Sequence, residues 1–239
     1  MPRRARLMLP GVPVHVIQRG NNRHACFHAD EDYRRYLEWL CEYAPQTGCR
    51  IHAYVLMTNH VHLLLTPAAA ESTAHLMKSL GQRYVQYVNR VYQRSGTLWE
   101  GRFRSCLVDT DGYFLACQRY IELNPVRAAM VAHPASYRWS SYRANAQGRQ
   151  PDSVVEPHPA YLALAGTGVA RLEAYRALFK NALETDVVDS IRAATNGNFA
   201  LGSARFASEV AAALGRRAVP GRSGRPRKAS EPESLPLLR

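Results

Sequence analysis

The sequence lacks both a long apolar run and a disulfide framework. No stretch approaches the ~20 apolar residues that a transmembrane helix needs, and the basic start, Met1 to Leu7, lacks the apolar centre of a signal peptide. The five cysteines are odd in number and include no Cys-x-x-Cys pair, which argues against a disulfide-stapled secreted domain. We therefore expect a cytoplasmic protein that does not enter a membrane and is not exported.

Acidic residues are scarce relative to basic ones. The chain carries 31 Lys and Arg against 19 Asp and Glu, which gives a formal net charge of +12. Such a surplus favours a polyanionic partner, most commonly a nucleic acid. A basic surface that serves only solubility is the alternative.

The apolar patterns predict an α+β fold. Apolar and polar residues alternate in short β-rich runs, and between these runs apolar residues recur at helical spacing. The expected elements are strands over 13–19, 50–57, 60–65 and 98–109 and helices over 30–44, 71–94 and 111–123. This order is that of a ferredoxin-like split βαβ sandwich with an antiparallel sheet.

Composition divides the chain into four parts. Residues 1–146 are expected to form the main domain, and 147–159, which contain several Pro and Gly, a linker. Residues 160–217 are alanine-rich and predict a helical C-terminal extension. Residues 218–239 are basic and rich in Pro, Gly and Ser, which predicts a disordered tail.

Two histidines, His60 and His62, flank Val61 in a run that otherwise predicts a buried strand. Residues two apart on a strand share a face, roughly 6.5 to 7 Å apart, so both imidazoles could bind one cation. The alternative is a pair of hydrogen-bonded core histidines. Two histidines on one face, preceded by Asn59, favour the metal site.

Tyr120 and Asn124 are four apart in a predicted helix, so they are neighbours on one helical face. A hydroxyl that can attack and an amide oxygen that can bind a metal would lie together. For Asn124 the alternative is a helix N-cap, because Pro125 follows it. Tyr120 is one of 13 tyrosines, most of which fit core packing.

Several segments together resemble the REP-associated tyrosine transposases, a branch of the single-tyrosine HUH transposase superfamily. They occur in family order: PGVPVHVIQRGNNRHACF (10–27), AYVLMTNHVHLLL (53–65), GTLWEGRFRS (96–105), RYIELNPVRA (119–128) and YRWSSY (137–142). Each segment alone is weakly specific, but the ordered set is highly specific.

The resemblance implies that 1–146 is an HUH catalytic domain and assigns its site residues. His60 and His62 would hold a divalent metal, Mg²⁺ or Mn²⁺, which Asn124 would complete, and Tyr120 would be the nucleophile. It also implies recognition of repetitive palindromic elements as single-stranded hairpin DNA, cleavage through a 5′-phosphotyrosine, strand transfer, and a monomer without a small-molecule substrate. Thr58 departs from the family, where many relatives have proline.

Arginines near these elements are candidates for DNA contacts. Arg102 and Arg104 are predicted to share a strand face, and the other candidates are Arg19, Arg23, Arg127, Arg222 and Arg225. The last two lie in a Gly-Arg-Pro segment that resembles an AT-hook, although the favoured interpretation is an unstructured basic tail that adds affinity without reading sequence. Trp99 or Trp139 could stack on DNA bases, but core packing is the simpler role for both.

Two other functions are compatible with parts of this pattern. A non-catalytic nucleic-acid-binding module of ferredoxin-like fold would have no use for paired histidines. Metal-assisted hydrolysis by water would need the histidines but not Tyr120. The metal-dependent tyrosine nuclease accounts for all the residues singled out.

Overall fold

A five-stranded sheet organises the protein. The computed structural model describes residues 5–110, 112–148 and 154–221. The strands are β1 (Val14–Arg19), β2 (Cys49–Met57), β3 (His60–Pro67), β4 (Arg104–Val108) and β5 (Ala200–Leu201), in the order β2-β3-β1-β4-β5. All neighbours are antiparallel except β4 and β5. The expected mixed α+β fold is confirmed.

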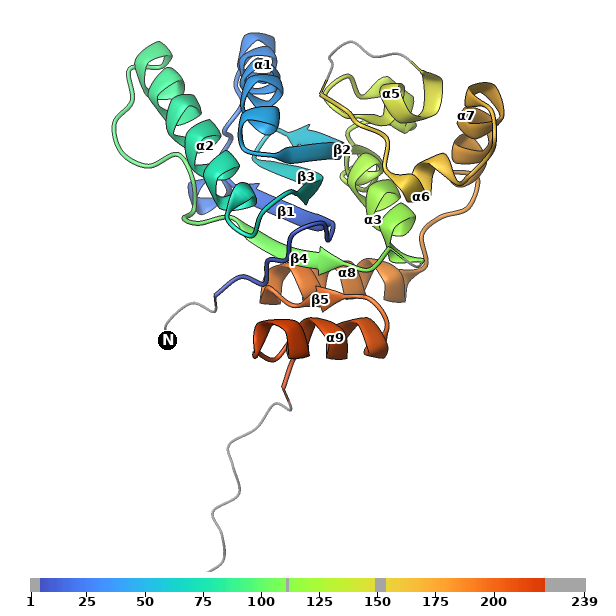
Figure 1. The fold of residues 1–239 in the computed structure, drawn as a ribbon. Coiled ribbons are helices and arrows are strands. Elements are labelled where there is room, and N and C mark those ends of the chain that lie inside the picture. The colour runs from blue at the N-terminus through green and yellow to red at the C-terminus, as the bar shows by residue number, and fades with distance from the viewer. Residues whose placement is uncertain (1–4, 111, 149–153, 222–239) are drawn as a thin grey trace, which may run out of the picture.

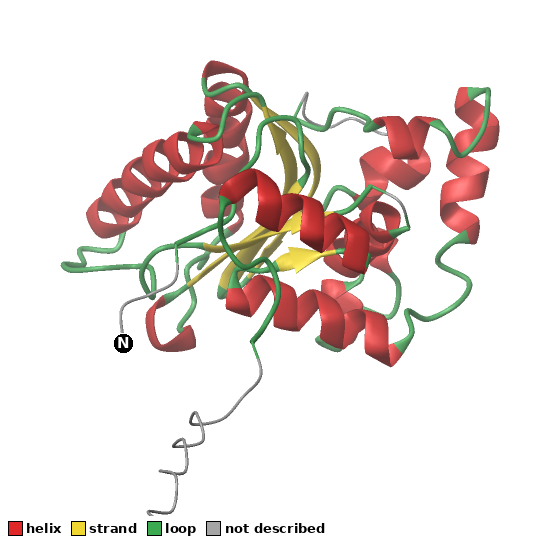
Figure 2. Ribbon diagram, turned by 60° about the horizontal axis from the view of Figure 1, so that its bottom comes forward, coloured by secondary structure: helices red, strands yellow, loops and turns green. Residues whose placement is uncertain are grey.

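Helices cover both faces of the sheet, as Figures 1 and 2 show. Two long helices, α1 (Asp30–Gln46) and α2 (Ser72–Val91), lie side by side on one face. Against the other face pack α3 (Tyr113–Glu122) and α8 (Thr185–Gly197). The remaining helices are η1 (Asn21–Arg23), α4 (Asn124–Arg127), η2 (Pro134–Ser136), α5 (Tyr142–Gln147), α6 (Pro159–Leu162), α7 (Gly168–Ala177) and α9 (Ala204–Leu214).

The burial of β2 and β3 follows from this two-sided cover. Every residue of β3 after His60 is buried, and in β2 only Arg50 is exposed. Strands covered on both faces read as nearly continuous apolar runs rather than alternating ones. His62 is therefore a polar residue inside a fully enclosed strand.

The fourth predicted strand is only half correct. The sequence predicts a strand over 98–109, but β4 begins at Arg104, and 98–103 form a loop that touches the sheet through a bridge between Gly20 and Trp99. Gly101 has a φ of 137°, a conformation that favours glycine and interrupts an extended strand. The alternation of faces predicted for this segment does not hold before Arg104.

The C-terminal part of the chain packs on the main sheet. Helix α8 lies against β4, β5 extends the sheet beside β4, and α9 covers β5 (Figure 1). Val188, Ile191 and Leu201 join the same hydrophobic core as β1 and β3. The sequence did not indicate β5, because a two-residue strand carries no periodicity.

None of the helices in the described ranges combines the length and the apolar character needed to span a bilayer. The five cysteines all lie in the described part of the chain, and none of them forms a disulfide bond there. Most of the predicted tail, residues 222–239 with Arg222 and Arg225, lies outside the described residues.

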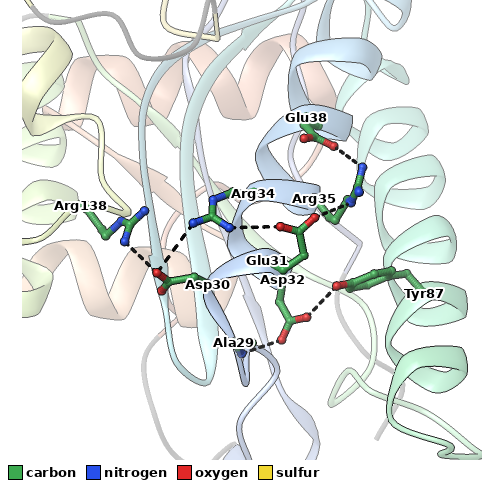
Figure 3. A network of polar contacts seen from close by, with 9 residues as sticks. All are labelled: Ala29, Asp30, Glu31, Asp32, Arg34, Arg35, Glu38, Tyr87 and Arg138. Carbon is green, nitrogen blue, oxygen red and sulfur yellow. Dashed lines mark hydrogen bonds and ion pairs between the residues drawn. The ribbon is translucent and has the colours of Figure 1, made fainter.

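Asp32 anchors the start of α1 to the chain before it and to α2 (Figure 3). Its fully buried carboxylate accepts hydrogen bonds from the backbone N–H groups of His28 and Ala29, at 2.7 and 2.9 Å. The hydroxyls of Tyr87 and Tyr92 donate to it at 3.0 and 2.8 Å. A negative side chain in the first helical turn also complements the helix dipole.

Substitution Asp32→Ala should lower the free energy of unfolding by about 2–4 kcal/mol, because it leaves buried donors without an acceptor. Chemical denaturation measures the change. The control is Glu38→Ala in the same network: Glu38 pairs with Arg35 at 3.0 Å on the exposed face of α1, so its loss should cost less than about 1 kcal/mol. Equal effects of the two substitutions would contradict the assignment.

Candidate active site

The pairing of β1 with β3 places both histidines of the motif on one face of the sheet. Arg19 lies opposite His60 and Ile17 opposite His62. The His60 and His62 rings are 5.0 Å apart between centroids. The predicted shared face is thus present, and it is the face that α3 and α8 cover.

Helix α3 brings Tyr120 to this face. The helix follows Gly112, whose φ is 86°, and buries Phe114, Cys117 and Ile121. The Tyr120 ring lies 5.9 Å from the ring of His62, edge to face, and Tyr120 is 7% exposed.

Asn124 begins α4 immediately after α3. The residue in the N-cap position of α4 is Leu123, and no side chain caps that helix. The N-cap role that the sequence suggested for Asn124 is therefore not observed. Its side chain is half-buried and lines the same cavity as Tyr120.

A cavity of about 270 Å³ brings these residues together. Of the predicted site residues, His60, His62, Tyr120, Asn124 and Arg19 line it. The other lining residues are His15, Ile17, Arg192, Thr195 and Asn196. Neither His15 nor the three residues of α8 were singled out from the sequence. Helix α8 is remote from the histidine motif in the sequence, and only the fold brings it to the cavity.

Burial disfavours the charged form of each histidine of the site. Burial lowers the pKa of His60 to about 4, with a further contribution from Arg19. Burial also lowers the pKa of His15 to about 3 and that of His62 well below its usual value. A neutral imidazole has one nitrogen lone pair to offer to a metal or a proton.

Each histidine of the motif has its Nδ1 atom held by a neighbour. His60 Nδ1 lies 2.6 Å from Asn59 Oδ1, and the Asn59 amide donates to the carbonyl oxygen of Arg23 at 3.0 Å. His62 Nδ1 lies 2.8 Å from His15 Nε2. Metal-binding histidines are commonly held through the nitrogen that does not bind the metal. Both rings thus keep Nε2 for another partner.

These residues fit a divalent metal with mixed ligands. His60 and His62 can supply two imidazole nitrogens and Asn124 an amide oxygen. Across the described residues, no cluster of three or more His, Cys, Asp or Glu side chains offers a different metal site.

Arg127 lies against the predicted nucleophile. Its guanidinium carbon is 4.0 Å from the centroid of the Tyr120 ring, and its Nη2 donates to the Tyr120 carbonyl oxygen at 2.7 Å. Burial lowers the pKa of Arg127. This arginine, predicted as a DNA contact, thus also holds the backbone and ring of Tyr120.

An arginine-lined groove adjoins the cavity. It has a volume of about 320 Å³ and shares Ile17, Arg19 and Asn196 with the cavity. Its other arginines are Arg6, Arg102 and Arg104. Arg6, which the sequence analysis missed, is held by a hydrogen bond to the Phe103 carbonyl oxygen at 2.9 Å.

The remaining DNA-contact candidates lie elsewhere. Arg23 is exposed in η1, within the described part of the chain, and lines neither the cavity nor the groove. Trp99 and Trp139 are 6% and 9% exposed, and Trp139 stacks on Tyr33 with ring centroids 4.6 Å apart. Both tryptophans are core residues, so neither offers a free face to a base.

Glu122 anchors α3 between Tyr120 and Asn124. This fully buried carboxyl group accepts hydrogen bonds from Ser141 at 2.7 Å, Asn145 at 2.8 Å and the Tyr175 hydroxyl at 2.7 Å. Burial raises its pKa to about 7. Because Tyr175 lies in α7, the C-terminal part of the chain helps to position the end of α3.

Substitution Glu122→Ala should lower the free energy of unfolding by about 3–5 kcal/mol, since three buried donors lose their acceptor. Thermal or denaturant unfolding measures it. Glu173→Ala is the control, because Glu173 is exposed on α7 and its removal should change stability by less than about 0.5 kcal/mol. A loss below 1 kcal/mol for Glu122→Ala would show that the network is not structural.

Comparisons with known proteins place part of the chain in a family. Residues 9–124 match the family described as "Transposase IS200 like", a range that contains His60, His62, Tyr120 and Asn124. No curated protein matches the chain.

Among solved structures, the chain is similar to a REP-associated tyrosine transposase bound to a REP hairpin. Sequence identity is 15%, the TM-score is 0.51, and the match covers 67% of this chain and 93% of that one. A protein from Deinococcus radiodurans described as a transposase is 21% identical, with a TM-score of 0.36 and coverage of 54% and 92%. The first of these likenesses supports the fold.

Proposed function

Since residues 9–124 match the IS200-like transposase family, we propose that this chain cleaves and rejoins single-stranded DNA through a covalent bond to Tyr120. The observation that carries the proposal is one cavity lined by His60, His62, Tyr120 and Asn124. These residues come from β3, α3 and α4.

In the proposed step, the Tyr120 hydroxyl oxygen attacks the scissile phosphorus. A bond forms between this oxygen and the 5′ phosphate, and the bond to the 3′ oxygen breaks, so that the 3′ end leaves as a hydroxyl. The phenol proton is lost and the leaving oxygen gains one. One phosphodiester replaces another, so the 3′ hydroxyl of a second strand can reverse the step without ATP.

His60, His62 and Asn124 are the proposed metal ligands. When bound, Mg²⁺ or Mn²⁺ would polarise the scissile phosphate and neutralise the charge that develops on it. The chain's own contribution is to keep both imidazoles neutral and held through Nδ1. Arg127 orients the Tyr120 ring beside them.

The proposed substrate is a single-stranded DNA hairpin. The groove lined by Arg6, Arg19, Arg102 and Arg104 leads to the cavity and suits a phosphate backbone. The similar transposase was solved bound to a REP hairpin, which supports a hairpin as substrate here. Binding of a polyanion also matches the net charge of +12.

We also propose that the protein works as a monomer. Helix α3 folds back onto the sheet of its own chain, and all four proposed site residues line one cavity within that chain. The site therefore needs no residue from a second copy.

The direct test of the nucleophile uses labelled hairpin DNA and Mn²⁺, followed by a denaturing gel. We expect a covalent adduct with the wild-type chain and none with Tyr120→Phe, because only the hydroxyl is removed. Tyr113→Phe, on the same helix, is the control and should leave the adduct intact. Cleavage without an adduct would favour hydrolysis by water, and binding without cleavage would favour a non-catalytic module.

Substitution of Arg102 and Arg104 by alanine should weaken binding of single-stranded DNA about tenfold and reduce the slope of log K against log salt by about 1.4, because two phosphate contacts are lost. Fluorescence anisotropy at several salt concentrations measures both values. Arg34→Ala removes a similar exposed charge from α1, on the opposite face, and should leave binding nearly unchanged. Equal losses for both variants would mean that only net charge matters.

A further inference from the structure

Thr195 reaches the site from outside the region matched to the family. It lies in α8, beyond the match to residues 9–124, and is 4% exposed. Its Oγ1 atom lies 2.7 Å from the Ile191 carbonyl oxygen, 2.9 Å from His15 Nδ1 and 3.2 Å from Cys106 Sγ. The hydroxyl has only one proton to share among these three contacts.

The direction of each hydrogen bond follows from what each partner can do. A carbonyl oxygen only accepts, so at 2.7 Å the Thr195 hydroxyl must donate to Ile191. Oγ1 is then an acceptor toward His15, whose Nδ1 must carry the proton. Burial raises the pKa of Cys106 to about 12, so its thiol keeps its proton and can donate to the same oxygen.

The position of the proton on His15 determines the position of the proton on His62. His15 is 1% exposed, and a second proton on its ring would bury an unpaired charge, which is costly. With its one proton on Nδ1, its Nε2 atom is an acceptor. His62 Nδ1, 2.8 Å away, must therefore donate to it. His62 is 2% exposed, so the same cost of a buried charge leaves it a single proton, on Nδ1, and its lone pair is on Nε2.

We propose that Thr195 is a positioning residue which, through His15, fixes His62 as the tautomer with a proton on Nδ1 and a lone pair on Nε2. The inference rests on the proposed function in one respect, that His62 binds a metal. The two hydrogen bonds that link Thr195 to His15 and His15 to His62 make α8 part of the metal site. For His60 the residue that holds Nδ1 is Asn59, its neighbour in the sequence.

Loss of the Thr195 hydroxyl has a defined consequence. In Thr195→Val, a side chain of similar shape, His15 Nδ1 loses its acceptor. The proton is then better placed on His15 Nε2, where it is donated to His62 Nδ1 across the same 2.8 Å contact. His62 must in turn carry its own proton on Nε2, and the lone pair that a metal needs is lost.

The test is ¹⁵N NMR of histidine-labelled, metal-free, full-length protein. In the wild type and in Thr195→Ser, which keeps the hydroxyl, we expect both His15 and His62 to carry the proton on Nδ1. In Thr195→Val we expect both rings to shift toward the Nε2–H form. Affinity for Mn²⁺, measured by calorimetry, should fall about tenfold in Thr195→Val and be retained in Thr195→Ser.

The wild-type spectrum alone can overturn the inference, even if Thr195→Val does not fold: an Nε2–H tautomer at His62 contradicts it. Unchanged tautomers and unchanged Mn²⁺ affinity in a folded Thr195→Val protein also contradict it. Failure of the proposed function looks different. In that case the Nδ1–H tautomers would be present, but wild-type protein would not bind Mn²⁺.

Discussion

The register between β1 and β3 is the constraint on which the site depends. With Ile17 opposite His62 and Arg19 opposite His60, both histidines face α3 and α8 while Val61 and Leu63 face the other layer. A shift by one residue would turn every side chain of β3 to the opposite face. Both faces of β3 are enclosed, so the misplaced histidines would enter the apolar layer under α1 and α2. The packing that stabilises the sheet thus also fixes the site.

The imidazoles are tolerated here because burial favours their neutral form and each is hydrogen-bonded. Asn59 holds His60, and the pair formed by His15 and Thr195 holds His62. Burying a polar group without a partner costs a few kcal/mol, which these contacts offset. The same contacts leave Nε2 of each ring for a metal, so stability and function require the same arrangement.

Local periodicity predicted the parts of the site that are close in sequence. A two-residue period placed His60 and His62 on one face, and a spacing of four placed Tyr120 near Asn124, as observed. The predictions failed where contacts between remote segments or the local backbone conformation determine the structure. Gly101, with its positive φ, interrupts the strand that the sequence predicts from Leu98 onward. Thr195 contacts His15 in the site, and Tyr175 contacts Glu122, which anchors α3. Both lie in helices whose sequence shows only that they are helices, so no sequence signal reveals these roles.

In the proposed site, His60 and His62 share one metal ion beside Tyr120. Pulsed electron paramagnetic resonance of the Mn²⁺-loaded protein, with ¹⁵N-labelled histidine, tests it most directly because it reports nitrogens bound to the metal. We expect two coordinated histidine nitrogens in the wild type and one in His62→Ala. A spectrum without histidine coupling, or one unchanged by His62→Ala, would contradict it.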